Sequence, residues 1–206
     1  MFKRIITSLF LITLISLIIL SSNIWIFASS ILLICSLGLY EWIKNSFSMI
    51  FVGLAIILNF GFWSIYFVSI DESNYVLFGL IIFNTAIFDT FAYVIGSKIG
   101  KRFIVKKISP KKTLEGLIGG LFATVVFGML IKLMLFNGLL NIFIIGGIFA
   151  FFGDLFISYF KRKSGVKDTG NILPGHGGVL DRIDSHLFAT PVLIYILLIL
   201  WKIYSY

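Results

Sequence analysis

Cysteine is almost absent from this sequence, and acidic residues are few. Cys35 is the only cysteine, so a disulfide framework within the chain is excluded. There is no internal repeat, no low-complexity stretch and no polar region of the size of a soluble domain. There is also no Walker A loop and no Ser-His-Asp or Cys-His arrangement. Neither P-loop chemistry nor a serine or cysteine nucleophile is therefore expected.

Apolar residues dominate what is present. They make up 59% of the 206 residues, whereas soluble proteins have roughly 45–50%, and several runs reach the roughly 20 residues that a bilayer-spanning helix needs. We expect one all-α integral membrane domain, a polytopic transmembrane helix bundle with N-terminal spans in 1–70 and a catalytic core in 75–206. The expected spans are 5–22, 24–43, 49–70, 75–96, 114–136, 139–160 and 186–204, about seven in all.

The distribution of charge predicts the orientation of this bundle. With the N-terminus in the cytoplasm, all 17 basic residues except Lys132 and Lys202 fall on the cytoplasmic side, which includes the loops 97–113 and 161–185. Cytoplasmic loops are enriched in Lys and Arg, so this bias explains the net charge of +8 without nucleic acid as a partner. We expect a cytoplasmic N-terminus and an external C-terminus. A signal peptide in place of the first span is the alternative, because a basic start precedes that apolar run.

Two carboxylates, Asp89 and Asp154, lie inside expected spans, each about two turns from the predicted cytoplasmic end. A charged Asp within the bilayer costs roughly 2.5–3.5 kcal/mol on insertion scales. Such residues usually face the bundle interior or a wet cavity and take part in function. A structural carboxylate paired with a Lys of a neighbouring helix is the alternative for both positions.

Asp181 and Asp184 are three residues apart near the start of the last expected span, a spacing that places both on one face of a helix. Together with Asp154 from the preceding span they would form an oxygen-rich pocket. Mg²⁺ prefers such carboxylate oxygens, completed by waters and substrate phosphates. The alternative is a pair of acidic residues favoured at a helix N-terminus by the helix dipole. The spacing alone leaves both interpretations open.

Basic residues and glycines surround these acids. Consecutive backbone N–H groups in the glycine turn of residues 174–178 can form an anion-binding nest. Acids for a metal, bases for phosphates and a glycine turn together indicate a site for a metal and a polyphosphate, whereas lipid headgroups are the alternative partner of the bases. His176 remains open as a proton donor, a phosphate ligand or a turn residue. The surrounding bases are Lys161, Arg162, Lys163, Lys167 and Arg182.

This polar segment carries a long signature. From Ser158 to Asp184 the sequence matches S-x-x-K-R-x4-K-D…P-G-H-G-G-x-x-D-R-x-D without gaps over 27 residues. The pattern resembles the signature of the phosphatidate cytidylyltransferase (CDP-diglyceride synthetase) family. Three further blocks are similar to that family, at Tyr40–Trp42, Asp89–Gly96 and Ser109–Gly116. The N-terminal apolar region is short, so fewer spans are expected here than in larger members.

The resemblance implies transfer of a cytidylyl group from CTP to phosphatidic acid, giving CDP-diacylglycerol and pyrophosphate for phospholipid biosynthesis. It implies that Asp154, Asp181 and Asp184 hold Mg²⁺, with room for a second cation such as K⁺, and that the protein is a homodimer. Asp168 is expected to orient Lys167 or Arg182. The residues expected to act in catalysis are Lys161, Arg162, Lys167, Asp168, His176 and Arg182. Those expected to bind substrate are Asp89, Ser109, Lys111, Lys112, Thr113, Ser158, Gly175, Gly177 and Gly178.

Two alternative functions can be distinguished by their products or by their sequence features. A CTP-dependent lipid kinase, acting on a polyprenol or phytol, would release CDP rather than pyrophosphate. A non-enzymatic channel or anionic-lipid transporter would carry ionisable residues through the middle of the membrane, whereas here only Lys132 lies near a span centre. We expect a multi-pass protein of the bacterial plasma membrane with its active site on the cytoplasmic side, because the chain is compact and has no targeting extension.

Overall fold

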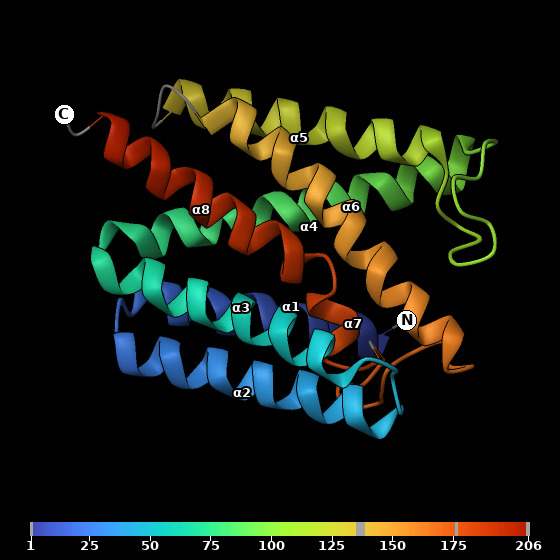
Figure 1. Ribbon diagram of the computed structural model, residues 1–206. Coiled ribbons are helices and arrows are strands. Elements are labelled where there is room, and N and C mark those ends of the chain that lie inside the picture. Colours follow the sequence, from blue (N-terminus) through green and yellow to red (C-terminus); the bar gives the residue numbers. More distant parts are fainter. Residues whose placement is uncertain (1, 135–138, 176, 205–206) are drawn as a thin grey trace. The chain divides into compact units, whose positions relative to one another are not determined.

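The chain is helical throughout the residues that its computed structural model describes, which are 2–134, 139–175 and 177–204, and no β-strand occurs among them (Figure 1). The all-α prediction is confirmed, and each of the expected spans contains a helix. The short additional helix α7 immediately precedes the last span. The helices are α1 (Phe2–Leu20), α2 (Ile24–Lys44), α3 (Ile50–Ile70), α4 (Ser73–Ile99), α5 (Leu114–Met134), α6 (Leu139–Lys163), α7 (Leu180–Ile183) and α8 (His186–Tyr204).

Most of these helices have the length and composition of membrane spans. Among the described residues, the 5 helices α2 to α6 are long and apolar enough to cross a bilayer, and shorter apolar helices cover Ile6–Leu20 and His186–Lys202. Large apolar side chains such as Leu17, Trp25 and Phe51 are exposed on the helix surfaces, as contact with lipid would require. The chain is therefore a polytopic membrane protein.

The helices gather into two compact units. The first contains Met1–Gly79 and Phe160–Asp184, and the second contains Leu80–Tyr159 and Ser185–Tyr206. Because the boundaries fall inside α4 and α6, these two helices contribute to both units. The polar segment between α6 and α7 belongs to the first unit, together with α1, α2 and α3, whereas the loop 97–113 belongs to the second.

Local sequence signals explain where α2 begins and ends. Asn23 precedes its first residue, and the Asn23 side-chain oxygen accepts hydrogen bonds from the backbone N–H groups of Trp25 (2.9 Å) and Ile26 (3.2 Å). Asn is a favoured residue at this capping position. At the other end the amide N–H of Asn45 donates to the carbonyl of Glu41 at 3.1 Å. The last turn of α2 therefore presents Glu41 and Asn45 side by side.

An aromatic core fixes that last turn within the first unit. The ring of Trp42, which is 1% exposed, lies 5.3 Å from the ring of Phe47 and 4.9 Å from that of Phe160, centroid to centroid. On α3, Gly53 leaves room for the indole, because an added Cβ there would overlap the Trp42 ring. Because Glu41 directly precedes Trp42 in the chain, the packing of Trp42 also fixes the position of the Glu41 backbone.

Replacing Gly53 by alanine is expected to lower the unfolding temperature of the detergent-solubilised protein, because overpacking a filled core costs about 1–3 kcal/mol. Thermal unfolding followed by circular dichroism measures the change. Gly38→Ala on α2 is the matched control, since an added Cβ there would lie 3.5 Å from the nearest atom, Cδ1 of Ile183, which is an ordinary contact. A Gly53→Ala protein as stable as the Gly38→Ala protein would contradict this packing.

The second unit is built around a separate core of α4, α5, α6 and α8. Phe88, Ala150, Phe151 and Ala189 are buried together there. The backbone of Gly120 lies against the ring of Phe88, where an added Cβ would come within 2.8 Å of the ring. Ala150 and Phe151 lie one turn before Asp154 on α6, so this core positions the part of the helix that carries the predicted metal ligand.

Candidate functional site

Helix α6 ends in a glycine turn that leads into the segment 164–179. Gly165 has a φ of +71°, a conformation that favours glycine. The N–H of Gly165 donates to the carbonyl of Arg162 (3.1 Å) and that of Val166 to the carbonyl of Lys161 (2.9 Å), which is the Schellman arrangement at a helix C-terminus. The guanidinium of Arg162 also donates to the carbonyl of Val166 at 3.0 Å. The signature bases thus stand where the segment leaves the helix.

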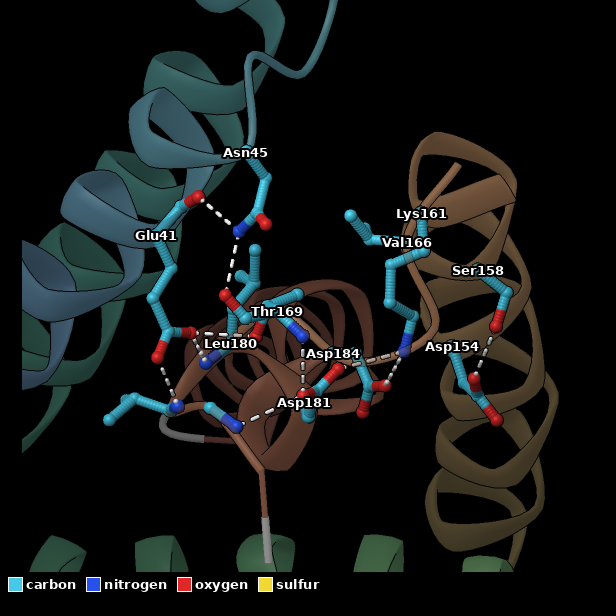
Figure 2. A network of polar contacts seen from close by, with 12 residues as sticks. Glu41, Asn45, Asp154, Ser158, Lys161, Val166, Thr169, Leu180, Asp181 and Asp184 are labelled. Atoms are coloured by element: carbon cyan, nitrogen blue, oxygen red, sulfur yellow. Dashed lines mark hydrogen bonds and ion pairs between the residues drawn. The ribbon is translucent and has the colours of Figure 1, made fainter. Parts of the chain in front are cut away.

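Lys161 lies between two of the predicted metal-binding carboxylates (Figure 2). Its ammonium Nζ is 2.9 Å from Oδ1 of Asp181 and 3.9 Å from Oδ2 of Asp184. The Lys161 and Asp181 side chains are only 10% and 5% exposed, and that of Asp184 is 13% exposed. Lys161, near the start of the signature, and Asp181 and Asp184, at its end, therefore form one buried, charged cluster.

The carboxyl of Asp181 is held in its charged form. Burial alone would raise its pKa, but the Lys161 charge and hydrogen bonds from Gly178, Lys161 and Thr169 outweigh burial and lower the pKa below its usual value. The backbone N–H groups of Thr169 and Gly178 donate to Oδ2 of Asp181 at 2.8 and 3.0 Å. Asp181 is thus an anion at neutral pH, with Oδ1 facing Lys161 and Oδ2 facing the backbone.

Glu41 is a member of this site that the sequence analysis did not select. Its side chain is buried, and its Oε1 accepts a hydrogen bond from the N–H of Val179 at 2.9 Å. Its Oε2 accepts from the N–H of Leu180 at 2.8 Å and from the hydroxyl of Thr169 at 2.7 Å. A signal was available, because Glu41 is the only charged residue of the expected span 24–43.

Three consecutive amides at the end of this segment bind carboxylates of the chain itself, and only the first of them, Gly178, belongs to the glycine turn 174–178 in which an anion-binding nest is predicted. Binding of a substrate anion by that turn stays a prediction. The consecutive amides of Gly178, Val179 and Leu180 donate to Asp181 and Glu41. Gly178 has no space for a side chain, since an added Cβ would overlap the Thr169 hydroxyl and the Glu41 carboxylate. In the described structure these three amides therefore organise the segment around internal anions.

Asp154 lies in the second unit, with two other predicted site residues. Its Oδ2 is 2.8 Å from the ammonium of Lys112, and its Oδ1 accepts a hydrogen bond from the hydroxyl of Ser158 at 3.1 Å (Figure 2 shows the latter). The Lys112 ammonium also donates to the carbonyl of Phe151 at 3.3 Å and lies 4.7 Å from the centroid of its ring. The ion pair between Lys112 and Asp154 thus joins the loop 97–113 to helix α6.

The loop 97–113 is folded back on itself at the start of α5. Thr113 is buried, and its hydroxyl oxygen accepts a hydrogen bond from the N–H of Gly116 at 3.1 Å, so it caps α5. The Glu115 carboxylate accepts from the N–H groups of Lys101 and Arg102 at 3.0 and 3.1 Å. These contacts give the basic loop a defined shape beside the Lys112–Asp154 pair.

The remaining predicted residues are distributed around these two clusters. Arg162, Lys167, Asp168 and Arg182 are exposed in the first unit, and Gly175 and Gly177 have positive φ angles of 79° and 85°. In the second unit Lys111 is exposed, whereas Ser109 and Asp89 are partly buried. His176 lies outside the described residues. Substrate contact and catalysis by these residues remain predictions.

The donor chemistry suits a hard cation. In neither unit do the described residues include a group of three His, Cys, Asp or Glu side chains that could hold a metal ion. Asp154 belongs to one unit and the Asp181/Asp184 pair to the other. The pair does share a cation, because the Lys161 ammonium reaches both carboxylates. Carboxylate oxygens are the ligands that Mg²⁺ prefers, so the residue types fit the predicted metal.

Comparison with known proteins finds one family across most of the chain. Residues 44–200 match the profile described as the cytidylyltransferase family. A protein named phosphatidate cytidylyltransferase from Thermotoga maritima is 44% identical over 124 residues, which cover 55% of this chain and 46% of that relative. Proteins of the same name from Staphylococcus aureus and Staphylococcus haemolyticus are 39% and 40% identical over 159 residues, or 73% of this chain and 60% of each relative.

The matched region contains both clusters described above. Lys161, Asp181, Asp154 and Lys112 all lie within residues 44–200, whereas Glu41 lies just before them. The chain spans 46% to 60% of the length of these curated relatives.

Proposed function

Because this chain belongs to the cytidylyltransferase family, we propose that it transfers the cytidylyl group of CTP to phosphatidic acid, forming CDP-diacylglycerol and releasing pyrophosphate. The relatives named phosphatidate cytidylyltransferase support this choice of substrates. The observation that carries the proposal is the cluster of Lys161 with Asp181 and Asp184, which joins both ends of the signature in a buried, charged site. Anionic substrates, one of them a lipid, require such charged groups on a membrane protein.

The reaction needs no nucleophile from the protein. A phosphate oxygen of phosphatidic acid attacks the α-phosphorus of CTP, a new P–O bond forms, and the bond between the α-phosphorus and the bridging oxygen breaks as pyrophosphate leaves. The protein contributes mainly positioning and neutralisation of charge. Exposed bases of the first unit suit this role, because Arg can hold two phosphate oxygens at once. We assign it to Arg162, Lys167 and Arg182, with Lys111 and Lys112 from the loop 97–113.

We assign Mg²⁺ to Asp154, Asp181 and Asp184. Helix α6 carries Asp154, Ser158 and Lys161 at intervals of four and three residues, a spacing that aligns side chains along one face of a helix. This periodicity supports a shared role for Asp154 and the pair that contacts Lys161. When bound, the metal would neutralise charge that develops on the phosphate oxygens. The carboxylates would orient it, and a second cation such as K⁺ would add to the same neutralisation.

The setting of the enzyme completes the proposal. We propose a multi-pass protein of the bacterial plasma membrane with a cytoplasmic N-terminus, an external C-terminus and its site on the cytoplasmic side, where Lys and Arg are enriched in loops. Phosphatidic acid would then enter from the surrounding lipid and CTP from the cytoplasm. A homodimer is the proposed assembly.

The purified protein, supplied with CTP labelled at the α-phosphate and phosphatidic acid in detergent micelles, is expected to form labelled CDP-diacylglycerol only when Mg²⁺ is present. Thin-layer chromatography of the lipid and a pyrophosphate assay measure the two products. Asp181→Ala is expected to lose this activity. Release of CDP and a phosphorylated lipid would instead indicate a lipid kinase, and an undiminished rate in Asp181→Ala would contradict the assigned site.

A further inference from the structure

We infer that Glu41 is the positioning residue of this site: it holds the segment 164–179 in the conformation that places Asp181 beside Lys161. The effect of Glu41 on catalysis rests on the proposed function, whereas its effect on the loop rests only on contacts within the first unit. Glu41 is assigned no contact with the reacting atoms. It acts through Thr169, Val179 and Leu180.

One carboxylate, that of Glu41, joins both ends of the segment 164–179. Glu41 accepts hydrogen bonds from Thr169 near the beginning and from Val179 and Leu180 at the end (Figure 2). These donors are a hydroxyl and two backbone amides, all directed at a buried carboxylate. Hydrogen bonds to a charged acceptor are about twice as strong as those between neutral groups. Glu41 therefore closes the segment into a loop with fixed ends.

Thr169, one of the residues that bind Glu41, and Gly178 also hold Asp181. Thr169 donates its hydroxyl to Glu41 and its backbone N–H to Asp181. Gly178 donates to Asp181, and the next two amides donate to Glu41. A displacement of Thr169 or of residues 178–180 therefore changes the surroundings of both carboxylates together. The position of Asp181 relative to Lys161 depends in this way on a residue of α2.

Glu41 is itself held in place by its neighbours at the end of α2. The side-chain amide of Asn45 donates to the carbonyl of Glu41 at 2.7 Å and to the carbonyl of Thr169 at 2.6 Å. The adjacent Trp42 is buried against Phe160 and Phe47. A carboxylate on a well-packed helix end is a suitable reference point, because outer partners that orient ligands need fixed rotamers of their own.

Glu41→Gln tests the inference, since one carboxylate oxygen becomes an N–H₂ group that cannot accept from an amide. Two readouts are needed. Trypsin cleavage after Lys167, measured by mass spectrometry without metal or substrate, is expected to become about tenfold faster, because cleavage follows the population of the opened loop. In the activity assay, the Mg²⁺ concentration for half-maximal rate is expected to rise roughly 10–100-fold, as for loss of a partner that orients metal ligands.

Two controls separate positioning from general loosening. Glu72→Gln changes an exposed carboxylate in the turn before α4 and is expected to match the wild type in both readouts. Cleavage after Lys107, in the loop 97–113, is an internal reference that is expected to stay constant in Glu41→Gln. Thr169→Val removes only the hydroxyl donor, keeps the side-chain volume and is expected to shift both readouts in the same direction by a smaller factor. It decides the matter if Glu41→Gln does not fold.

The outcomes are distinct. Equal acceleration of cleavage after Lys107 and Lys167, or a wild-type Mg²⁺ dependence alongside faster cleavage after Lys167, would show Glu41 to be a structural residue only and would overturn the inference. Wild-type cleavage in both Glu41→Gln and Thr169→Val would overturn it as well. A wild-type protein that forms no CDP-diacylglycerol refutes the proposed function instead, and the cleavage readout still decides whether Glu41 holds the loop.

Discussion

Replacing Lys161 by methionine is expected to lower activity roughly a thousandfold and to destabilise the protein by about 3–5 kcal/mol, as removal of one partner from a buried ion pair does. Methionine matches the lysine side chain up to Cε and lacks only the ammonium, so the packing of the stem is preserved. The change leaves the Asp181 carboxylate, 5% exposed, without the ammonium at 2.9 Å, and Asp184 without the same cation at 3.9 Å. Activity and the unfolding temperature of the purified protein measure the two effects.

The stability loss in Lys161→Met is expected to depend on pH. In the wild type the folded-state pKa of Asp181 lies below its ordinary value of 3.8. The stability that this shift represents is present above the unfolded pKa and is lost as the pH falls through the folded pKa. Without Lys161 the folded pKa rises, so the difference between the variant and the wild type is expected to be largest at neutral pH and to shrink below about pH 4. Unfolding temperatures measured between about pH 3 and pH 8 test this sign.

Lys163→Met is the matched control for this experiment. Lys163 is exposed in the last turn of the same helix, and exposed charges contribute about 0–1 kcal/mol to stability. This variant is expected to unfold within a few degrees of the wild type at every pH. Two results would contradict a stabilising role for the buried ion pair. One is a Lys161→Met protein that unfolds at the same temperature as Lys163→Met, and the other is a loss of stability in Lys161→Met that grows as the pH falls.

Asp154→Asn is expected to reduce the rate roughly a thousandfold, because a carboxylate assigned to the metal is replaced by a neutral amide of the same size. Because asparagine has nearly the same shape as aspartate, its side-chain oxygen can still accept the hydrogen bond from Ser158. The substitution does remove the negative partner of Lys112 at 2.8 Å. Since the Asp154 side chain is 31% exposed, the expected effect on stability is small. Initial rates across a range of Mg²⁺ concentrations measure the loss.

Lys112→Met shows whether Asp154 acts only through its lysine. If Asp154 served merely to hold Lys112, both variants would lose activity by the same factor and both would keep the wild-type Mg²⁺ dependence. The assigned metal role predicts a larger loss in Asp154→Asn, together with a changed Mg²⁺ dependence that Lys112→Met does not share. A wild-type rate in Asp154→Asn would remove this residue from the site.

Several features of the site followed from local sequence because they depend on neighbouring residues. The spacing of Asp181 and Asp184 predicted that they would share a face, and both do contact one ammonium. The basic end of α6 and the glycine turn after it could also be located from the signature. The sequence could not show that a lysine ammonium lies between Asp181 and Asp184, because Lys161 is 20 residues before Asp181. The sequence also did not predict that the amides of Gly178, Val179 and Leu180 donate to carboxylates of the chain itself.

Glu41 shows most clearly what periodicity and motif could not provide. It lies in an apolar run, in a short block that resembled the family but had no chemical partner nearby in the sequence. Its partner Thr169 is 128 residues away, and Leu180 is 139 residues away. Hydropathy identifies a costly carboxylate in a span, but it does not identify the donors that satisfy it.

The amino-acid sequence by itself determined that this is a helical membrane protein of the cytidylyltransferase family, because apolar runs and a contiguous signature are properties of short stretches of chain. Only the tertiary structure decided which donors each carboxylate receives. That choice depends on buried side chains brought together by packing, where every charged or polar atom must find a partner from whichever helix lies against it.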